Sequence, residues 1–379
     1  MAGSRLTTAG IVIPEGTPDV KLDRYGAIAG LALVSAVALT GCATDKAPAA
    51  SGDSKSDCAT GQISASGSTA QKSAVAEWTT AYGQKCGANV TYDAQGSGQG
   101  VKDFIAGKVA FAGSDSSLKP EEQTAADARC KTGKAIHLPL VAGPIAIVYN
   151  IKGVDKLTLT PSVIAQIFAG KLTKWNDPAI AAANSGVTLP ATTITTFHRS
   201  KDSGTTDNLA KFLGAAAASD WTFGAGKAWK APGGQGAPDS AGIVSAVNGT
   251  DGAVSYVDNP DAKKNSLKAA SIDFGSGPVA ITDASVGKAV AAAEKTGSGD
   301  DIKLSLKYDL KDAGAYPLAL VTYEITCAKG LPADQSKVVK GFLGWVASDE
   351  GQAKLSPIGY SPIPAEVLTD VRKSIAAIS

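Results

Sequence analysis

Two long apolar segments place the strongest constraint on how this chain can fold. The first runs from Ile136 to Asn150, and the second runs from Tyr316 to Cys327. The first segment is longer than an average strand, which favours a strand that crosses from one lobe to another. The second segment can carry the chain back. We therefore expect two lobes that are joined by two crossing strands, with a hinge and a cleft between them.

Short β-rich runs alternate with helical segments around these strands, which is typical of an α/β protein. The pattern predicts further strands at 59–65, 88–94, 109–113, 193–197 and 253–257. It predicts helices at 70–83, 99–107, 161–169, 177–184, 205–218, 239–248, 333–348 and 364–377. Lobe I then comprises residues 58–143 and 319–379, and lobe II comprises residues 144–318.

Charge and histidine content argue against several classes of protein. With 36 Lys and Arg against 35 Asp and Glu, the chain lacks the basic excess of a nucleic-acid-binding protein. It contains only two histidines, His137 and His198, which excludes a His-rich metal site and leaves little for a Ser-His-Asp triad. We therefore expect no metal and no cofactor.

The N-terminal region has the pattern of an export signal. Residues 25–41 are apolar and uncharged, and Lys21 and Arg24 precede them. This run ends at Leu39-Thr40-Gly41-Cys42-Ala43, which resembles the bacterial lipobox, in which the cysteine is lipidated. The alternative is a plain apolar helix that ends at a cysteine.

These features predict a signal peptide at 1–41, a lipid on Cys42 and a flexible tether at 42–57. The lipid would anchor the exported protein to the outer face of the cell membrane. Residues 1–19 fit no signal peptide, and we interpret them as an over-extended gene start, with Val20 as the natural first residue.

Three loops combine Gly with Ser or Thr where a predicted strand meets a predicted helix. They are Gly67-Ser68-Thr69 before the helix at Ala70, Gly96-Ser97-Gly98-Gln99-Gly100 before Val101, and Ser203-Gly204-Thr205-Thr206 before Asp207. Free N–H groups and the helix dipole attract anions at such junctions. Each loop alone reads as an ordinary helix cap, but the three together favour an anion site.

The second loop departs from the motifs of nucleotide-binding and hydrolytic proteins. Its glycines have the spacing G-x-G-x-G instead of the dinucleotide-binding G-x-G-x-x-G, and the loop lacks a Walker lysine. A nucleophile elbow needs glycine two residues before Ser97, where this chain has Gln95.

Two charged residues are candidates to complete the anion site. Arg199 ends an apolar predicted strand, and its planar guanidinium can bind two oxygens of a tetrahedral oxyanion. Its alternative is a surface ion pair, for instance with Asp202. Asp115 follows the predicted strand 109–113, and its alternative is a loop acid or a cap near Pro120.

With these residues, the chain resembles the substrate-binding lipoproteins of bacterial phosphate ABC importers, which are type II periplasmic binding proteins. The resemblance runs from about Cys58 to the C-terminus. It rests on the order and spacing of GSTAQKSAVAEW, YDAQGSGQGVKDFIAGKVAFAGSDSSL, PLVAGPIAIVYN, IFAGKLTKWNDPAI, HRSKDSGTTDN, VSYVDNPDAKKN and IGYSPIP. It implies a two-lobed type II periplasmic-binding-protein fold, hinged by the two crossing strands.

The resemblance also implies a phosphate shell, carried over position by position. Its members are Ser68, Thr69, Ala70, Ser97, Asp115, Arg199, Ser203, Gly204 and Thr205. Family members often have an Asp two residues after the Arg, where it braces the guanidinium. This chain has Lys201 there and its acid one position later, at Asp202. Lys201 either adds positive charge near the cleft or faces water.

A carboxylate suits this anion because phosphate keeps a proton near neutral pH and sulfate does not. Asp115 can accept the P–OH proton, whereas it would face only lone pairs of sulfate. We therefore expect a monomer that binds inorganic phosphate, delivers it to the permease of an ABC importer and is not an enzyme. The alternatives are another oxyanion (sulfate, molybdate or a phosphonate), a phosphate-ester hydrolase on the same fold, and a surface adhesin or receptor.

The four cysteines besides Cys42 suggest two disulfides in an exported protein, although free thiols remain an alternative. Cys58 and Cys86 lie eleven residues before the Thr of the first loop and the Ser of the second loop, respectively. If both loops lie at one edge of a parallel sheet, the two cysteines lie level at the opposite edge. We predict Cys58–Cys86. We also predict Cys130–Cys327, because Cys130 precedes the first crossing strand and Cys327 ends the second, so the two residues can meet if these strands are antiparallel.

Overall fold

The computed structural model describes residues 58–379, and every structural statement below concerns these residues. The predicted signal peptide, the lipidation at Cys42 and the tether lie outside the described residues. The described residues belong to one compact unit, 53–379. Within them, no helix is both long enough and apolar enough to cross a membrane.

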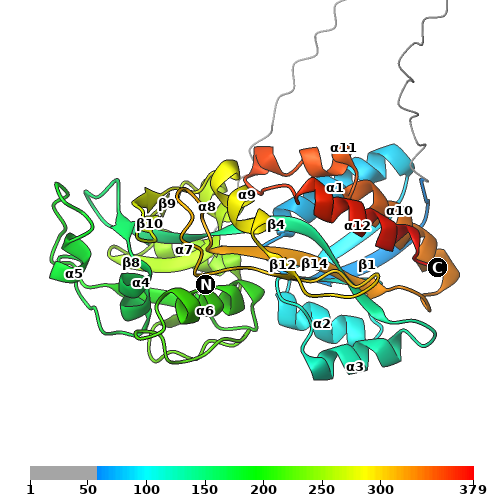
Figure 1. Ribbon diagram of the computed structural model, residues 1–379, viewed down its shortest axis with the longest axis horizontal. Coiled ribbons are helices and arrows are strands. Elements are labelled where there is room, and N and C mark those ends of the chain that lie inside the picture. Colours follow the sequence, from blue (N-terminus) through cyan, green and yellow to red (C-terminus); the bar gives the residue numbers. More distant parts are fainter. Residues whose placement is uncertain (1–57) are drawn as a thin grey trace, which may run out of the picture. The chain divides into compact units, whose positions relative to one another are not determined.

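Helices and strands alternate along the chain (Figure 1). The helices are α1 (Lys72–Cys86), α2 (Ser97–Ile105), α3 (Pro120–Arg129), α4 (Pro161–Phe168), α5 (Pro178–Ala181), α6 (Gly204–Ala216), α7 (Ser240–Asn248), α8 (Asn259–Lys264), α9 (Asp283–Ala291), α10 (Ala333–Val346), α11 (Asp349–Ala353) and α12 (Ala365–Ala376), with a 3₁₀ turn at Ser356–Ile358. The longer strands are β1 (Gln62–Gly67), β2 (Asn89–Asp93), β3 (Phe111–Ser114), β4 (Ala135–Asn150), β6 (Thr195–Arg199), β8 (Ala253–Asp258) and β14 (Ala319–Cys327). The short strands are β5 (Thr158–Leu159), β7 (Gln235–Ala237), β9 (Lys268–Ala269), β10 (Ser271–Asp273), β11 (Pro278–Val279), β12 (Glu294–Lys295) and β13 (Leu304–Ser305).

One sheet connects most of the strands, in the order β2-β1-β3-β14-β4-β8-β6-β7. The central strands β4 and β14 are antiparallel, as the disulfide prediction required. From Ala135 to Pro144, β4 pairs with β14, and from Ile145 to Asn150 it pairs with β8. A single strand therefore belongs to two halves of the sheet, which we call the first half (β1, β2, β3, β14 and the start of β4) and the second half (β6, β7, β8 and the end of β4).

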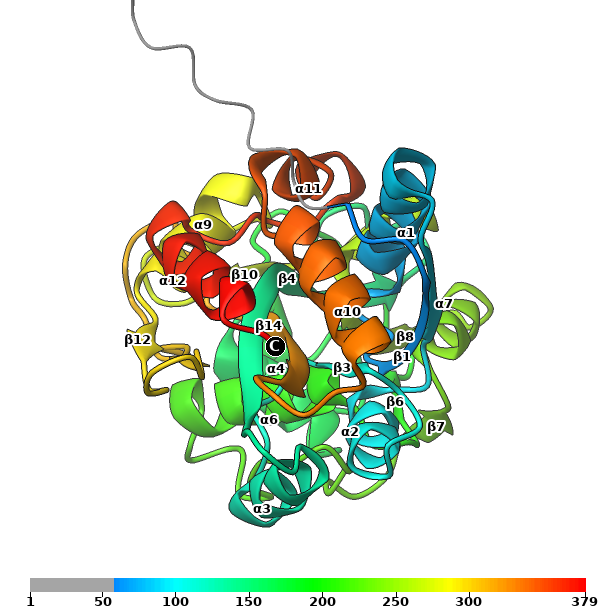
Figure 2. The same cartoon turned by 90° about the vertical axis from the view of Figure 1, so that its right-hand side faces the viewer.

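Helices bury both faces of the first half. In Figures 1 and 2, α1, α10 and α12 lie on one side of its strands, and α2 and α3 lie on the other. This two-sided cover explains why β4 is buried at every position except its last residue, Asn150. A strand whose two faces are both covered reads as a nearly continuous apolar run, which is the pattern found in the sequence. The fold is the predicted two-lobed α/β class.

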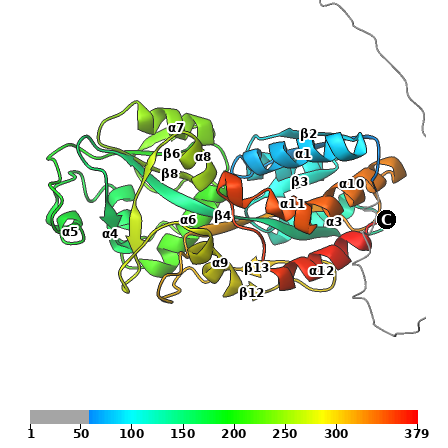
Figure 3. The ribbon, with the colours of Figure 1, turned by 90° about the horizontal axis from the view of Figure 1, so that it is seen from above.

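The second half is built around β8 and β6, which are parallel to each other. Helix α7 packs on both of these strands, and α6 packs on β8 and α4 (Figure 3). An aromatic cluster fills this region, in which the ring of Trp229 stacks on that of Tyr256 at 5.8 Å between centroids. The residue boundaries of the two lobes stay a prediction.

The helices at the three candidate loops begin at positions different from those predicted. Helix α2 begins at Ser97, ahead of the predicted range 99–107, and α6 begins at Gly204, one residue ahead of the predicted range 205–218. Helix α1 begins at Lys72, later than the predicted Ala70, because the Ala70 N–H donates to the Oγ of Ser68 at 3.0 Å.

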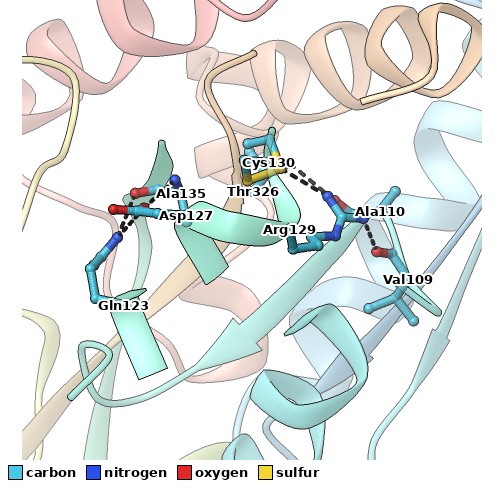
Figure 4. Close-up of a disulfide and its surroundings, with 9 residues drawn as sticks. Val109, Ala110, Gln123, Asp127, Arg129, Cys130, Ala135 and Thr326 are labelled. Carbon is cyan, nitrogen blue, oxygen red and sulfur yellow. Dashed lines mark hydrogen bonds between the residues drawn. A yellow bond between two sulfur atoms is a disulfide. The ribbon is translucent and has the colours of Figure 1, made fainter. Parts of the chain in front are cut away.

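Two disulfides link Cys58 to Cys86 and Cys130 to Cys327, which are the two predicted pairs. Strands β1 and β2 are parallel and pair Gln62 with Asn89, one residue away from the expected register, so the first pair lies just before two neighbouring strands. Figure 4 shows the surroundings of Cys130, where the Nη2 of Arg129 donates to the carbonyl of Val109 at 2.8 Å. The second disulfide therefore fixes the end of α3 to the end of β14.

Candidate anion-binding site

Asp115 follows β3 directly and connects the first two candidate loops. Its Oδ2 accepts hydrogen bonds from the hydroxyls of Ser68 at 2.7 Å and Ser97 at 3.1 Å. Its Oδ1 accepts one from the hydroxyl of Thr322 in β14 at 2.8 Å. Because β1 and β3 are parallel neighbours and α2 packs on both, their carboxyl ends bring these groups together.

The carboxyl group of Asp115 is buried, with 3% of the residue exposed. Burial raises its pKa, while the hydrogen bonds from Ser68, Thr322 and Ser97 and the charge of Arg199 oppose this shift. Three hydroxyl donors stabilise an ionised carboxylate, which can only accept hydrogen bonds. A buried acceptor of this kind is suited to a ligand that brings its own proton.

Arg199 ends β6 and is buried as well, with 2% exposed. Its Nη1 donates to the hydroxyls of Thr69 at 3.0 Å and Ser203 at 3.2 Å, and its Nη2 donates to the carbonyl of Pro238 at 3.2 Å. Its Nε is buried and has no hydrogen-bond partner. Burial lowers the pKa of Arg199, but an arginine remains protonated at physiological pH. The site thus holds a fixed positive charge.

The third loop starts α6 and packs against the other two loops. The hydroxyl of Ser203 caps the helix by accepting a hydrogen bond from the N–H of Thr206 at 3.4 Å. A β-carbon on Gly204 would lie 2.6 Å from the Oγ of Ser97 and 2.5 Å from the β-carbon of Asp115. Only glycine therefore fits where α6 meets the first half of the sheet.

All nine predicted shell residues are buried in this region, as hydrogen-bonded partners or as their chain neighbours. They are Ser68, Thr69, Ala70, Ser97, Asp115, Arg199, Ser203, Gly204 and Thr205. Their role as phosphate ligands stays a prediction.

Neither Lys201 nor Asp202 braces the guanidinium of Arg199 with its side chain. The Nζ of Lys201 donates to the Oε1 of Gln95 at 3.3 Å, and the carboxylate of Asp202 lies 3.7 Å from the Nζ of Lys102. The alternative of a surface ion pair between Arg199 and Asp202 is therefore wrong.

Two residues beside the site were missed by the sequence analysis. Thr322 is one of two threonines in the largely apolar strand β14, and only the sheet register shows that it reaches Asp115. Ser240 is the first residue of α7 and follows the capping residue Asp239. This polar helix start could have been recognised in the sequence as a further candidate loop. Its Oγ lies 2.9 Å from the Oγ1 of Thr69 and donates to the buried carboxyl of Asp258 at 3.2 Å.

The two histidines lie outside this hydrogen-bond network. The Nε2 of His137 accepts from the N–H of Leu118 at 3.0 Å, and its Nδ1 donates to Asp301 at 2.6 Å. The Nδ1 of His198 lies 3.0 Å from the carbonyl oxygen of Arg199. Among residues 58–379, no group of three or more His, Cys, Asp or Glu side chains is arranged to hold a metal ion.

Comparison with known proteins places the chain among binding proteins. The profile of a PBP superfamily domain matches residues 52–350. The chain is 40% identical over 358 residues to phosphate-binding protein PstS 3 of Mycobacterium leprae (strain TN), and the match covers 91% of this chain and 96% of that protein. It is 38% identical to phosphate-binding protein PstS 3 of Mycobacterium tuberculosis (strain ATCC 25618 / H37Rv), covering 95% of this chain and 100% of that protein.

Solved structures with the same fold are more distant in sequence. One is the high affinity periplasmic phosphate-binding protein PfluDING, with a TM-score of 0.68 and 21% identity over 83% of this chain and 93% of that one. Another is a phosphate binding protein from Stenotrophomonas maltophilia, with a TM-score of 0.63 and 21% identity over the same shares of the two chains, 83% and 93%.

Proposed function

The chain belongs to the PBP superfamily and, within it, to the family of the phosphate-binding PstS proteins, and from this premise we propose that it binds inorganic phosphate and delivers it to the permease of an ABC-type phosphate importer. The bound anion would lie in the cleft between the two lobes. The observation that carries the proposal is the buried carboxyl group of Asp115, which shares one small region with Arg199 and three loops of donors.

Each part of this region matches one property of phosphate. The guanidinium of Arg199 compensates the negative charge and can bind two oxygens. The N–H groups of Gly204 and Thr205 at the start of α6 supply further donors at the positive end of a helix. Asp115 accepts the P–OH proton. A site built around one required hydrogen bond rejects an analogue that lacks it by about 10⁴ to 10⁵.

We also propose that the protein is not an enzyme. Hydrolysis of a phosphate ester needs an activated nucleophile, and histidine is its most frequent base. The site hydroxyls of Ser68 and Ser97 donate to Asp115, which also accepts from Thr322. Both ring nitrogens of His137 are already hydrogen-bonded, Nε2 to the N–H of Leu118 and Nδ1 to Asp301. In the proposed site Asp115 accepts the P–OH proton as well as hydrogen bonds from three hydroxyls, so it is not available as a base for any one of them.

The N-terminal sequence supports export and attachment to a membrane. The apolar run at 25–41 and the lipobox-like end at Cys42 favour a lipid anchor at the outer face of the cell membrane, with residues 42–57 as the tether. We propose that the anchored protein acts as a monomer with the lobe boundaries given above.

Calorimetric titration of the dialysed mature protein with phosphate and with sulfate tests the proposal. We expect tight binding of phosphate and at least about 10³-fold weaker binding of sulfate near neutral pH. Equal affinities would favour the alternative of a general oxyanion-binding protein. Release of phosphate from an ester by the purified protein would favour the hydrolase alternative.

A further inference from the structure

Glu324 in β14 is a buried acid outside the predicted shell. It is 1% exposed and lies in register with Gly113 of β3 and Leu138 of β4. Its Oε2 is buried and has no hydrogen-bond partner. An ionised carboxylate with an unsatisfied oxygen in such a place has a large desolvation free energy. The surroundings of Glu324 therefore favour the protonated, neutral carboxyl group.

The side-chain amide of Gln71 lies beside Glu324, because it fills the space over Gly113, the residue with which Glu324 pairs. Gln71 is fully buried, and its Oε1 has no donor. Its Nε2 donates to the hydroxyl of Tyr92 at 3.0 Å, and that hydroxyl donates to the carbonyl of Ser68 at 2.9 Å. A chain of polar groups thus runs from Glu324 through Gln71 and Tyr92 to the first candidate loop.

Gly113 provides the space for this chain. A β-carbon there would collide with the Nε2 of Gln71 and would lie 2.5 Å from the hydroxyl oxygen of Tyr92. The polar groups are therefore packed directly over the backbone of β3, two residues before Asp115.

Two buried acceptors without a donor, the Oε2 of Glu324 and the Oε1 of Gln71, are left at one end of the chain. A proton on the carboxyl group makes Glu324 a donor and supplies both atoms at once. We propose that Glu324 is a positioning residue for phosphate binding, which as a neutral acid donates to Gln71 and so holds the chain of hydrogen bonds that fixes the Ser68 carbonyl. This inference rests on the proposed function.

Loss of that proton reverses the direction of the hydrogen bonds. A carboxylate only accepts, so the amide of Gln71 turns its NH₂ group toward Glu324 and its oxygen toward Tyr92. The hydroxyl of Tyr92 then donates to Gln71, and the carbonyl of Ser68 loses its donor. The loop that carries Ser68 and Thr69 is less well held in this state.

The groups that face Glu324 set the pH at which this change occurs. The turn before α1 presents the uncharged amide of Gln71, β2 presents Tyr92, the end of β3 leads to Asp115, and β4 presents Leu138. Burial, together with the charge of Asp115, raises the pKa of Glu324 to about 8, and the ability of the Gln71 amide to donate to the ionised carboxylate opposes this shift. Burial keeps the pKa of Tyr92 well above its usual value, so Tyr92 stays neutral.

Deprotonation of Glu324 therefore acts on phosphate in two ways as the pH rises through about 8. It adds a second negative charge close to Asp115, and it releases the Ser68 carbonyl. Phosphate is already mostly the monoprotonated dianion at this pH, so its own charge changes little as the pH rises further. Affinity should fall above this pH for reasons that lie in the protein.

The test compares phosphate titrations of the wild type and Glu324→Gln by calorimetry from about pH 6 to about pH 10. The glutamine amide can donate to Gln71 at every pH and has the same shape. Near pH 7 we expect the wild type and Glu324→Gln to bind phosphate with affinities that agree within about twofold. At higher pH we expect the affinity of the wild type, but not that of Glu324→Gln, to fall about fivefold or more. Glu366→Gln, at an exposed acid of α12, is the matched control and should keep the wild-type fall.

Two further measurements distinguish a positioning role of Glu324 from a general disturbance of the fold. An infrared band of a protonated carboxyl group should be present in the wild type at pH 7, disappear above about pH 8 and be absent from Glu324→Gln. Tyr92→Phe cuts the chain next to Ser68, so it should weaken binding already at neutral pH and reduce the alkaline fall.

The outcomes distinguish this inference from the proposed function. Phosphate binding with the same pH dependence in the wild type and in Glu324→Gln, or absence of the infrared band, would overturn the role of Glu324 and leave phosphate binding intact. No phosphate binding by the wild type at any pH would overturn both.

Discussion

Gly204 and Asp115 approach each other so closely that a β-carbon on Gly204 would lie 2.5 Å from the β-carbon of Asp115. The two residues come from opposite halves of the sheet, since Gly204 starts α6 and Asp115 follows β3. The backbone of Gly204 is ordinary helix, so glycine is required here for space and not for an unusual φ angle. This contact is where the two halves meet around the candidate site.

Gly204→Ala should therefore weaken phosphate binding. Overpacking typically costs about 1–3 kcal/mol, so we expect the dissociation constant to rise about tenfold or more. Calorimetry measures this change. Gly287→Ala in α9 is the matched control, because nothing lies within 4 Å of its added carbon. If both variants bind as the wild type does, the two halves do not meet at Gly204 when phosphate is bound.

Asp115→Asn should weaken phosphate binding and narrow the preference over sulfate. An amide can turn its NH₂ group toward either anion, whereas the carboxylate accepts the proton that only phosphate carries. Competition titrations with both anions measure the preference. Asp202→Asn, at the exposed ion pair with Lys102, should leave it unchanged within about twofold. An unaltered preference in Asp115→Asn would remove Asp115 from the binding site.

Arg199→Lys should cost more affinity than a conservative exchange suggests. The ammonium group keeps the charge but cannot reproduce the fork that reaches Thr69, Ser203 and Pro238. Hydrogen bonds to charged groups contribute about 1.5–3 kcal/mol each, so we expect a loss of at least about tenfold. Arg372→Lys, at the surface pair with Asp349, is the control. A loss below twofold in calorimetry would contradict direct contact between Arg199 and phosphate.

The two disulfides should contribute unequally to the free energy of unfolding. Cys130–Cys327 closes a loop with a sequence separation of 197, against 28 for Cys58–Cys86. The longer loop restricts the unfolded chain more, by about 1–2 kcal/mol in the chain-entropy treatment. Denaturant unfolding of the two double Cys→Ala variants measures the difference. A larger loss from the pair Cys58 and Cys86 would show that contacts in the folded state dominate.

Protonation of His137 should destabilise the fold in mild acid. Burial lowers its pKa, although the hydrogen bond to Asp301 opposes this shift. Below the unfolded value of about 6.5, the unfolded chain binds a proton that the folded protein does not. The free energy of unfolding should therefore fall as the pH drops below about 6.5, by at most about 1.4 kcal/mol per pH unit.

Denaturant unfolding at several pH values between about 5 and 7 measures this slope. His137→Gln should flatten it, and His198→Gln controls for the loss of a histidine elsewhere. An equal slope in the wild type and in His137→Gln would assign the acid sensitivity to other groups.

The sequence was most informative where the chain repeats a simple pattern. Ile136–Asn150 is almost entirely apolar because β4 has strands on both sides and helices on both faces. This strand could therefore be recognised from its own sequence, without knowing which strands lie beside it. The three loops could be recognised because Ser, Thr and Gly mark the starts of α2 and α6 and the turn before α1. The rule that parallel strands end at one edge accounts for the convergence of the first two loops, whereas the third loop follows β6 in the second half.

Residues whose partners lie on distant strands could not be found in this way. Thr322 reaches Asp115, and Glu324 reaches Gln71, only because β14 inserts between β3 and β4 with a particular register. The sequence contains one signal for Glu324, because an acid is unusual within an apolar run such as Tyr316–Cys327. The short strands between Lys268 and Ser305 were missed because two or three residues carry no periodic pattern.

The position of β14 also has a consequence for how the protein is made. This strand lies between β3 and β4, yet it is synthesised long after both of them. While the chain grows, the sheet half that carries Ser68, Ser97 and Asp115 lacks an internal strand, and β3 and β4 present open edges that invite pairing with other chains. The second half can form first from neighbours in sequence. Assembly of the first half has to wait until Cys327 has been added, which makes a prematurely ended chain prone to aggregate.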